Sequence, residues 1–400
     1  EIEKGFDIMK KQNIKEWLLS LQILLACVGA TTLVPLLVGF PPSTALFTAG
    51  IGTLLFGFIT KNKVPAFLGS SFAFITPMSI IVSQYGYEYS CGGFIIVGLI
   101  YIVFALLIYK IGVNKINKIL PPHITGTMII IIGLSLVPSA ITNIQGNILI
   151  AIISLSISLL ILLFGKGLLK QLGIMIALLV GYAISILCGL VDFSIVTQSQ
   201  SIMLPSIVLP KFDLTAIMIV APVALVTCLE HIGDITTLGV VTNKNFIENP
   251  GLHRTLIADG LATALGGLFG SVGNTTYGES TSVLALTKQY DSKLTRRAGI
   301  LAIILSLCGY FSGTLQSIPS FVVGAISLQL YFMIAWVGMK SLKDNKSYKS
   351  IKNIIIIIIM LIIGLGGFTL TLGIVSLSSL ALSAIVGVIL NIILNYKELK

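Results

Sequence analysis

The chain has 400 residues, of which 56% are hydrophobic and only 10% are charged, and its mean hydropathy is +1.03. A soluble domain cannot hide that much apolar surface, so the composition excludes one and indicates a polytopic membrane protein. The formal net charge of +10 does not indicate a nucleic-acid partner, because the lysines and arginines lie in short gaps between apolar segments, where they set the orientation in the membrane.

The basic residues divide the apolar sequence into membrane spans. The first apolar run starts near Trp17, after a lysine-containing segment, and a basic gap then follows every second run. By this count every lysine and arginine except Lys211 lies on one side of the membrane, which the positive-inside rule assigns to the cytoplasm. The pattern predicts fourteen spans with both termini in the cytoplasm, and fourteen spans can form two inverted repeats of seven.

Two of the spans are too rich in Gly, Ser, Thr and Pro to be continuous helices. One contains LGSSFAFITP at residues 68–77, and the other contains GSVGNTTYGES at residues 270–280. Each is the third span of its half, where an inverted-repeat transporter places interrupted spans around a site near the midplane. The alternative is a pair of kinked helices that pack through small residues. Two breaks at matched positions favour the binding site.

The eighth span carries two acidic residues on one face. Glu230 and Asp234 lie at i and i+4, one helical turn apart, in a stretch that is otherwise apolar. Carboxylates in such a place normally mark a substrate or ion path, and their mutual repulsion makes them candidates for holding and releasing a proton. His231 points off that face and is equally readable as a packing residue or a proton carrier. Asp259 is interpreted as an ordinary acidic residue at the start of the ninth span and is left out of the site.

The sequence offers no sign of an enzyme or of an ATP-driven pump. It contains no Walker-type phosphate loop, no HExxH and no GxSxG stretch, and its five cysteines lack metal-ligand spacing. We therefore expect a transporter without a cofactor or metal, driven by an ion gradient.

Several motifs resemble the nucleobase:cation symporter-2 family, also called nucleobase–ascorbate transporters, and most closely its bacterial uracil permeases. The motifs are GATTLVPLLVG, LEHIGD, NPGLHRTLIADGLAT and GNTTYGES, and the resemblance runs over nearly the whole chain. It implies an all-α polytopic fold of fourteen segments in two inverted seven-segment repeats, with short antiparallel strands in spans 3 and 10. It also implies a core domain (residues 13–112 and 213–313) and a gate domain (residues 119–192 and 315–396). Many members are dimers, so the resemblance also allows a homodimer.

The resemblance implies six substrate-binding positions. Glu230 and Glu279 correspond to the two glutamates that hold a pyrimidine ring from different sides. The other four supply a strand-end aromatic, backbone contacts or a small pocket-lining residue: Phe72, Tyr277, Gly278 and Ala30. A uracil edge alternates N–H donors and C=O acceptors, which carboxylate oxygens and backbone amides complement.

Three positions depart from the family pattern. Ser280 stands where the family signature has Asn, and Ser282 stands where it has Gly. Ser280 therefore bears on specificity or on the hydrogen bonds that hold the loop. Asp234 stands where the best-known uracil permease has a histidine, so the proton-coupling role is assigned to the group of Asp234, Glu230 and His231.

Taken together, the sequence predicts a proton-coupled importer of uracil in the bacterial cytoplasmic (inner) membrane that moves its core domain against its gate domain. Sodium is the alternative coupling ion. A xanthine or guanine symporter of the same family is the nearest alternative, but Glu279 favours uracil because purine members typically have Gln at that position. An anion exchanger or channel on the same fold is a further alternative, and the site carboxylates argue against it.

Overall fold

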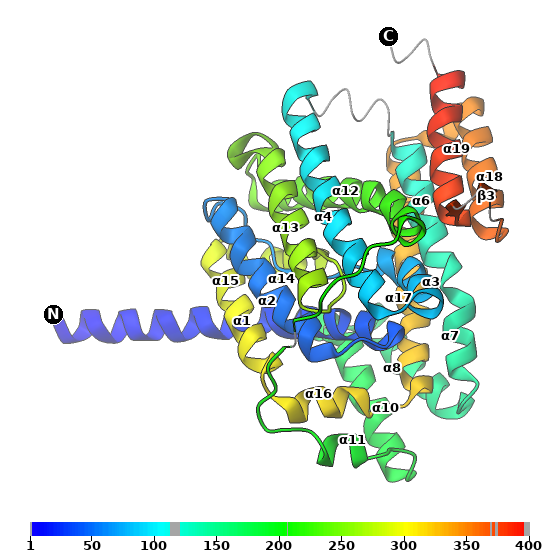
Figure 1. Cartoon of the computed structure of the whole chain (residues 1–400). Coiled ribbons are helices and arrows are strands. Elements are labelled where there is room, and N and C mark those ends of the chain that lie inside the picture. The colour runs from blue at the N-terminus through cyan, green and yellow to red at the C-terminus, as the bar shows by residue number, and fades with distance from the viewer. Residues whose placement is uncertain (1, 113–120, 206, 369, 373–374, 396–400) are drawn as a thin grey trace.

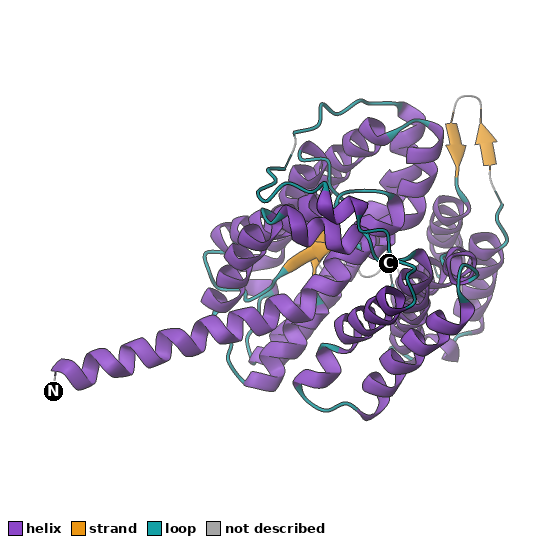
Figure 2. Ribbon diagram, turned by 90° about the horizontal axis from the view of Figure 1, so that it is seen from below, coloured by secondary structure: helices purple, strands orange, loops and turns teal. Residues whose placement is uncertain are grey.

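A computed structural model of the chain describes residues 2–112, 121–205, 207–368, 370–372 and 375–395. The fold is a bundle of helices with two small pairs of strands (Figures 1 and 2). The helices are α1 (Ile2–Val38), α2 (Pro42–Ile59), α3 (Ile75–Gln84), α4 (Tyr87–Ile111), α6 (Pro122–Ser135), α7 (Val137–Ile144), α8 (Ile148–Phe164), α9 (Leu168–Gln171), α10 (Gly173–Leu187), α11 (Ser194–Thr197), α12 (Leu214–Thr242), α13 (Leu252–Leu268), α14 (Gly278–Thr287), α15 (Ser292–Ser306), α16 (Gly309–Gln316), α17 (Ser320–Asp344), α18 (Ile351–Leu365) and α19 (Ser379–Leu394). The strands are β1 (Leu68–Ser70), β2 (Asn274–Thr276), β3 (Leu370–Leu372) and β4 (Val375–Leu377), and the short helical turns are η1 (Phe72–Phe74), η2 (Ile247–Gly251) and η3 (Ser347–Lys349).

Apolar helices dominate the architecture, as the composition predicts. Six helical segments are long and apolar enough to cross a membrane: Asn13–Val38, Pro42–Ile59, Tyr87–Ile111, Pro122–Ile144, Leu214–Thr242 and Ser320–Asp344. Five shorter apolar helices accompany them among the described residues. The class of the fold, a mostly helical polytopic membrane protein, is therefore confirmed. The count of fourteen spans in two inverted repeats stays a prediction.

The strands expected in the two broken spans are present. β1 and β2 pair antiparallel, with Leu68 opposite Thr276 and Ser70 opposite Asn274. Figure 2 shows this pair enclosed by helices. Extended backbone at membrane depth needs partners inside the protein, because lipid offers none. Side chains supply some of these partners: Thr53 Oγ1 accepts from the Leu68 amide at 2.9 Å, and Thr263 Oγ1 donates to the Asn274 carbonyl at 2.7 Å.

A second strand pair lies between α18 and α19. Leu370 pairs with Leu377 and Leu372 pairs with Val375, again antiparallel. This hairpin is not evident from the sequence, because each of its strands has only three residues and the apolar segments around it merge. In Figure 2 it stands at the periphery of the molecule, away from β1 and β2.

The helix interfaces fall into two groups. In one, α13 packs against α2 and α4, α15 packs against α1 and α2, and α12 packs against α4. In the other, α17 packs against α6, α7 and α8, and α18 packs against α19 at one edge of the molecule (Figure 1). Glycines let the backbones in the first group approach closely, since a Cβ at Gly98 of α4 would lie 2.4 Å from the Gly260 carbonyl of α13.

Candidate functional site

The two broken spans are joined at the point where β2 ends. The Tyr277 amide donates to the Phe67 carbonyl at 3.0 Å, which extends the strand pairing by one residue. The Tyr277 hydroxyl reaches back and donates to the Ser70 carbonyl at 2.8 Å. Tyr277 therefore fixes the geometry from which α14 begins.

Ser280 adds a second tie between the same segments. Its hydroxyl donates to the Tyr277 carbonyl at 2.7 Å, and it also accepts from the Phe67 amide at 3.3 Å. The side chain is completely buried. The serine that replaces the family asparagine thus holds the start of α14 against the segment that leads into β1. The neighbouring Ser282 is exposed and donates to the Gly278 carbonyl at 3.1 Å, within its own helix.

The start of α14 is open. Gly278 is exposed, and a Cβ built on it would meet no atom of the described residues within 4 Å. Glu279 follows in the first helical turn and is partly exposed. The amides of a first helical turn have no partner within the helix, so this end offers N–H donors beside a carboxylate acceptor.

The acidic face of α12 meets this open end. Glu230 is exposed, Asp234 is partly exposed, and α12 packs against both β2 and α14. Glu230, Asp234 and Glu279 lie close enough for their charges to repel one another. The structure therefore gathers the three carboxylates that the sequence analysis singled out. Gly233 is also exposed on α12, and a side chain there would meet no described atom within 4 Å.

A polar chain runs from this acidic face into the interior. Thr276 Oγ1 donates to Asp234 Oδ2 at 3.0 Å and lies 3.4 Å from His231 Nδ1. The same His231 nitrogen lies 3.0 Å from Asp259 Oδ2, and both of these side chains are completely buried. Four side chains from α12, β2 and α13 thus connect the site to the core of the molecule. Thr276 could not be identified from the sequence, because only the strand pairing brings it to α12.

The interpretation of Asp259 was wrong. It was expected at the start of its helix, where an acidic residue is ordinary, but α13 begins at Leu252 and Asp259 lies two turns inside it. The helical turn η2, which contains Pro250, occupies the segment taken for the entry into the helix. Asp259 is instead the buried partner of His231. His231 lies off the face that carries Glu230, as expected. Its Nδ1 atom is hydrogen-bonded with the Thr276 hydroxyl, and its ring packs edge-on against Phe56.

The remaining two candidates flank the strand pair. Phe72 opens the turn η1 directly after β1 and is half-buried. Ala30 lies on α1 and is only 2% exposed, and the carbonyl of its neighbour Thr31 accepts from the Ser70 hydroxyl at 2.9 Å. Both residues are therefore next to β1. Whether Ala30 lines a substrate pocket stays a prediction, because its side chain is buried in this structure.

Comparison with known proteins decides the family. The family model described as "Permease family" matches residues 14–373. The chain belongs to this family, the nucleobase:cation symporter-2 permeases. A probable uracil permease of Pasteurella multocida is 37% identical over 397 residues, which cover 97% of this chain and 95% of the relative. The uracil permease of Escherichia coli is 38% identical over 387 residues, covering 94% of this chain and 90% of the relative. The chain is accordingly a multi-pass membrane transporter and not an enzyme.

Solved structures support the fold. The transmembrane domain of the cyanobacterial bicarbonate transporter BicA superposes with a TM-score of 0.61 at 14% identity, covering 94% of this chain and 96% of that one. The murine anion transporter Slc26a9 superposes with a TM-score of 0.74 at 15% identity, covering 96% of this chain and 68% of that one. At such low identity the likeness extends to the fold alone.

Proposed function

We propose that this protein imports uracil together with a proton. One observation carries the proposal: the carboxylates of Glu230 and Glu279 lie near enough to repel each other at the open start of α14, where Gly278 leaves space. The names of the relatives supply the substrate class, because those with uracil in their names match the chain over nearly its full length.

The chemistry of the site suits a pyrimidine edge. The N–H groups of uracil would donate to the carboxylates of Glu230 and Glu279, and its carbonyl oxygens would accept from the main chain at Gly278. Phe72 and Tyr277 lie just after the two strands, beside this space. Phe72 would contact the base through its main chain, and Tyr277 would do so through its carbonyl, because its amide already donates to the Phe67 carbonyl. Ala30 would limit the pocket from α1. Once a bound base covers them, groups of this kind reject analogues that leave them unpaired.

Proton coupling would use the polar chain behind the site. Asp234 lies one turn, about 6 Å, from Glu230 along α12, so its charge affects the carboxylate that would hold substrate. Thr276 links Asp234 to His231, and His231 is paired with Asp259. A proton taken up by this group would therefore change the electrostatics of the substrate site. Sodium is the alternative ion, and an ion-replacement experiment separates the two.

Transport would proceed by movement of a core domain against a gate domain. The two packing groups described above would be the core (residues 13–112 and 213–313) and the gate (residues 119–192 and 315–396). Between them lies an apolar cavity of about 230 Å³, with Pro222 and Leu229 of α12 on one side and Met128 of α6 and Val388 of α19 on the other. The cavity leaves fewer packed contacts between the two groups than a close-packed interface has, which supports relative movement. Both termini would face the cytoplasm across a bacterial inner membrane.

The fold also occurs in proteins named for bicarbonate and anion transport, so an anion exchanger is the second class to consider. An anion needs positive potential at its site, and Glu230, Asp234 and Glu279 provide the opposite. We therefore favour the nucleobase. Among nucleobases, a purine importer for xanthine or guanine is the remaining alternative.

Competition for uptake tests the proposed substrate. Labelled uracil would be supplied to cells that express the protein, with an excess of unlabelled uracil, thymine, xanthine, guanine or ascorbate. We expect uracil to compete strongly and xanthine, guanine and ascorbate to leave uptake unchanged. If xanthine or guanine blocks uptake as well as uracil does, the protein is a purine carrier or a broad one. Absence of any saturable uracil uptake in well-expressed, inserted protein would reject the assignment.

A further inference from the structure

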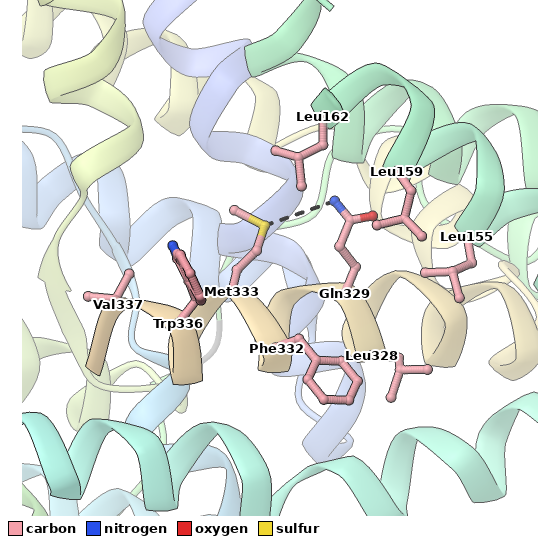
Figure 3. A pocket seen from close by; sticks show the side chains of 9 residues that line it. All are labelled: Leu155, Leu159, Leu162, Leu328, Gln329, Phe332, Met333, Trp336 and Val337. Atoms are coloured by element: carbon pink, nitrogen blue, oxygen red, sulfur yellow. Dashed lines mark hydrogen bonds between the residues drawn. The ribbon is translucent and has the colours of Figure 1, made fainter. Parts of the chain in front are cut away.

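An apolar groove runs along the outside of the second packing group. Its volume is about 550 Å³, and it lies between α8 and α17 (Figure 3). Leu155, Leu159 and Leu162 line it from α8, and the segment from Leu328 to Val337 lines it from α17. Its lining is apolar apart from Gln329, whose amide Nε2 is turned toward the Met333 sulfur at 3.9 Å.

The two helices run in the same direction along the groove. Figure 3 shows the α8 leucines in the order Leu155, Leu159, Leu162 above α17 residues that proceed from Leu328 to Val337. Each helix therefore leads toward the same end of the groove. On α17, nine residue steps separate the first and last lining residues, which is about 14 Å of helix.

Lysines stand at that shared end. Lys340 follows Trp336 and Val337 by one turn on the same face of α17, and Lys166 follows Leu162 of α8 by four residues. Both are exposed. Beyond Lys340 the exposed lysines continue at every third position to the start of α18: Lys343, Lys346, Lys349 and Lys352. Asp344 is the acidic residue within this stretch.

We propose that the groove holds an acyl chain of an anionic phospholipid whose phosphate lies between Lys166 and Lys340. The length of the groove is close to half of the roughly 30 Å hydrocarbon core of a bilayer, which is the depth of one leaflet. An apolar channel of that depth, with a lysine beyond its last lining residue on each helix, matches a lipid with one negative headgroup. Basic clusters immediately next to a membrane helix attract anionic lipids by the same electrostatics.

A second copy of the chain is the rival occupant, because a groove on the outside of a membrane protein also suits a helix from a partner. The two lysines distinguish a partner helix from an anionic lipid. A partner helix would fill the groove without needing Lys166 or Lys340, whereas an anionic lipid requires both its apolar part and its basic end.

Native mass spectrometry of the purified full-length protein in neutral detergent tests the proposal. Phosphatidylglycerol and phosphatidylcholine with identical acyl chains would be titrated in parallel. We expect the wild-type protein to retain phosphatidylglycerol in preference to phosphatidylcholine. The double variant Lys166→Gln/Lys340→Gln should bind phosphatidylglycerol more weakly by roughly fivefold per lysine removed, with phosphatidylcholine unaffected. Lys110→Gln/Lys244→Gln is the matched control, since it removes two exposed lysines at the ends of α4 and α12.

A second set of variants tests the apolar part. Leu159→Trp and Val337→Trp replace exposed side chains that line the groove, so we expect the protein to fold and the retention of both lipids to fall. Equal retention of the two lipids by the wild type would overturn the proposal, as would equal losses in the two double-lysine variants. If the tryptophan variants keep their lipid but dissociate a dimer, the groove is a subunit interface instead.

Discussion

Thr276 Oγ1 donates a hydrogen bond to Asp234 Oδ2 at 3.0 Å, and this contact joins the strand of one broken span to the acidic face of α12. Because the same hydroxyl lies 3.4 Å from His231 Nδ1, it lies between the acidic face of α12 and the buried His231–Asp259 pair. On the proposed mechanism, a change at Thr276 should therefore act on coupling and on stability without altering Glu230 or Glu279.

Replacing Thr276 by valine keeps the shape of the side chain and removes its hydroxyl. Asp234 and His231 then each lose a partner, which should lower stability by about 1–3 kcal/mol. We expect a lower thermal midpoint of the purified protein and a smaller pH-driven accumulation of uracil. Thr276→Ser keeps the hydroxyl and should behave nearly like wild type. A valine variant that accumulates uracil as wild type does would show that Thr276 is only a packing residue.

Glu279→Gln should weaken uracil binding by at least roughly tenfold, or about 1.4 kcal/mol. The substitution turns a group that only accepts into one that also donates, so an N–H of the base would face an N–H of the protein. Isothermal titration or scintillation proximity binding on purified protein measures the change. Glu248→Gln, at an exposed acidic residue outside the site, is the control. Unchanged affinity in the Glu279 variant would remove this residue from the site.

Gly278→Val should reduce uracil affinity by filling space that the chain itself leaves open. No described atom lies within 4 Å of a Cβ at this position, so the folded protein should tolerate the valine. Ser282→Val, one turn further along α14 and also exposed, is a suitable control. Gly98 would be a poor one, since valine there would press against the Gly260 carbonyl. Equal effects of the Gly278 and Ser282 variants on affinity would mean that substrate does not approach Gly278.

Ser280→Ala removes both hydrogen bonds that tie the start of α14 to the segment before β1. The Phe67 amide and the Tyr277 carbonyl would be left without this partner, so we expect about 1–3 kcal/mol less stability and a weaker affinity for uracil. Thermal unfolding and binding of the same preparation give both numbers. If stability falls while affinity is unchanged, Ser280 supports the fold without positioning the site.

The local sequence correctly predicted where the two broken spans depart from regular helix. The runs around Leu68–Ser70 and Asn274–Thr276 combine small and β-branched residues in otherwise apolar spans, and both became paired strands. The acidic spacing of Glu230 and Asp234 also survives, because it depends only on the helical period. These features are encoded within a few residues of one another.

Features that depend on contacts between distant parts of the chain could not be predicted from the sequence. Thr276 reaches Asp234 only through the register of β1 and β2, and Ser280 acquires its role from the Phe67 amide, 213 positions earlier. The burial of Asp259 was not predicted, because the start of α13 was expected at Asp259 and lies two turns earlier, at Leu252. That shift changes an acidic residue at a helix end into one inside the helix. The groove between α8 and α17 requires knowing that the two helices are neighbours.

Asp234→Asn should separate coupling from binding. The variant fixes that position as neutral, so the carboxylate can no longer take up and release a proton, while Glu230 and Glu279 remain to hold substrate. We expect uracil affinity within roughly tenfold of wild type, persistent uracil exchange, and loss of most pH-driven accumulation. Exchange and net uptake would be measured on the same proteoliposomes. A variant that loses exchange and accumulation together would place Asp234 in substrate binding instead.

The most direct test of the proposed proton-coupled import is uracil accumulation by proteoliposomes that contain the wild-type protein. Vesicles loaded at one pH would be diluted into a lower pH with labelled uracil, in sodium-free buffer and with or without a protonophore. We predict accumulation above the external concentration that the protonophore abolishes and that added sodium does not increase. Uptake that only equilibrates whatever the pH gradient, or accumulation that requires sodium, would contradict this account.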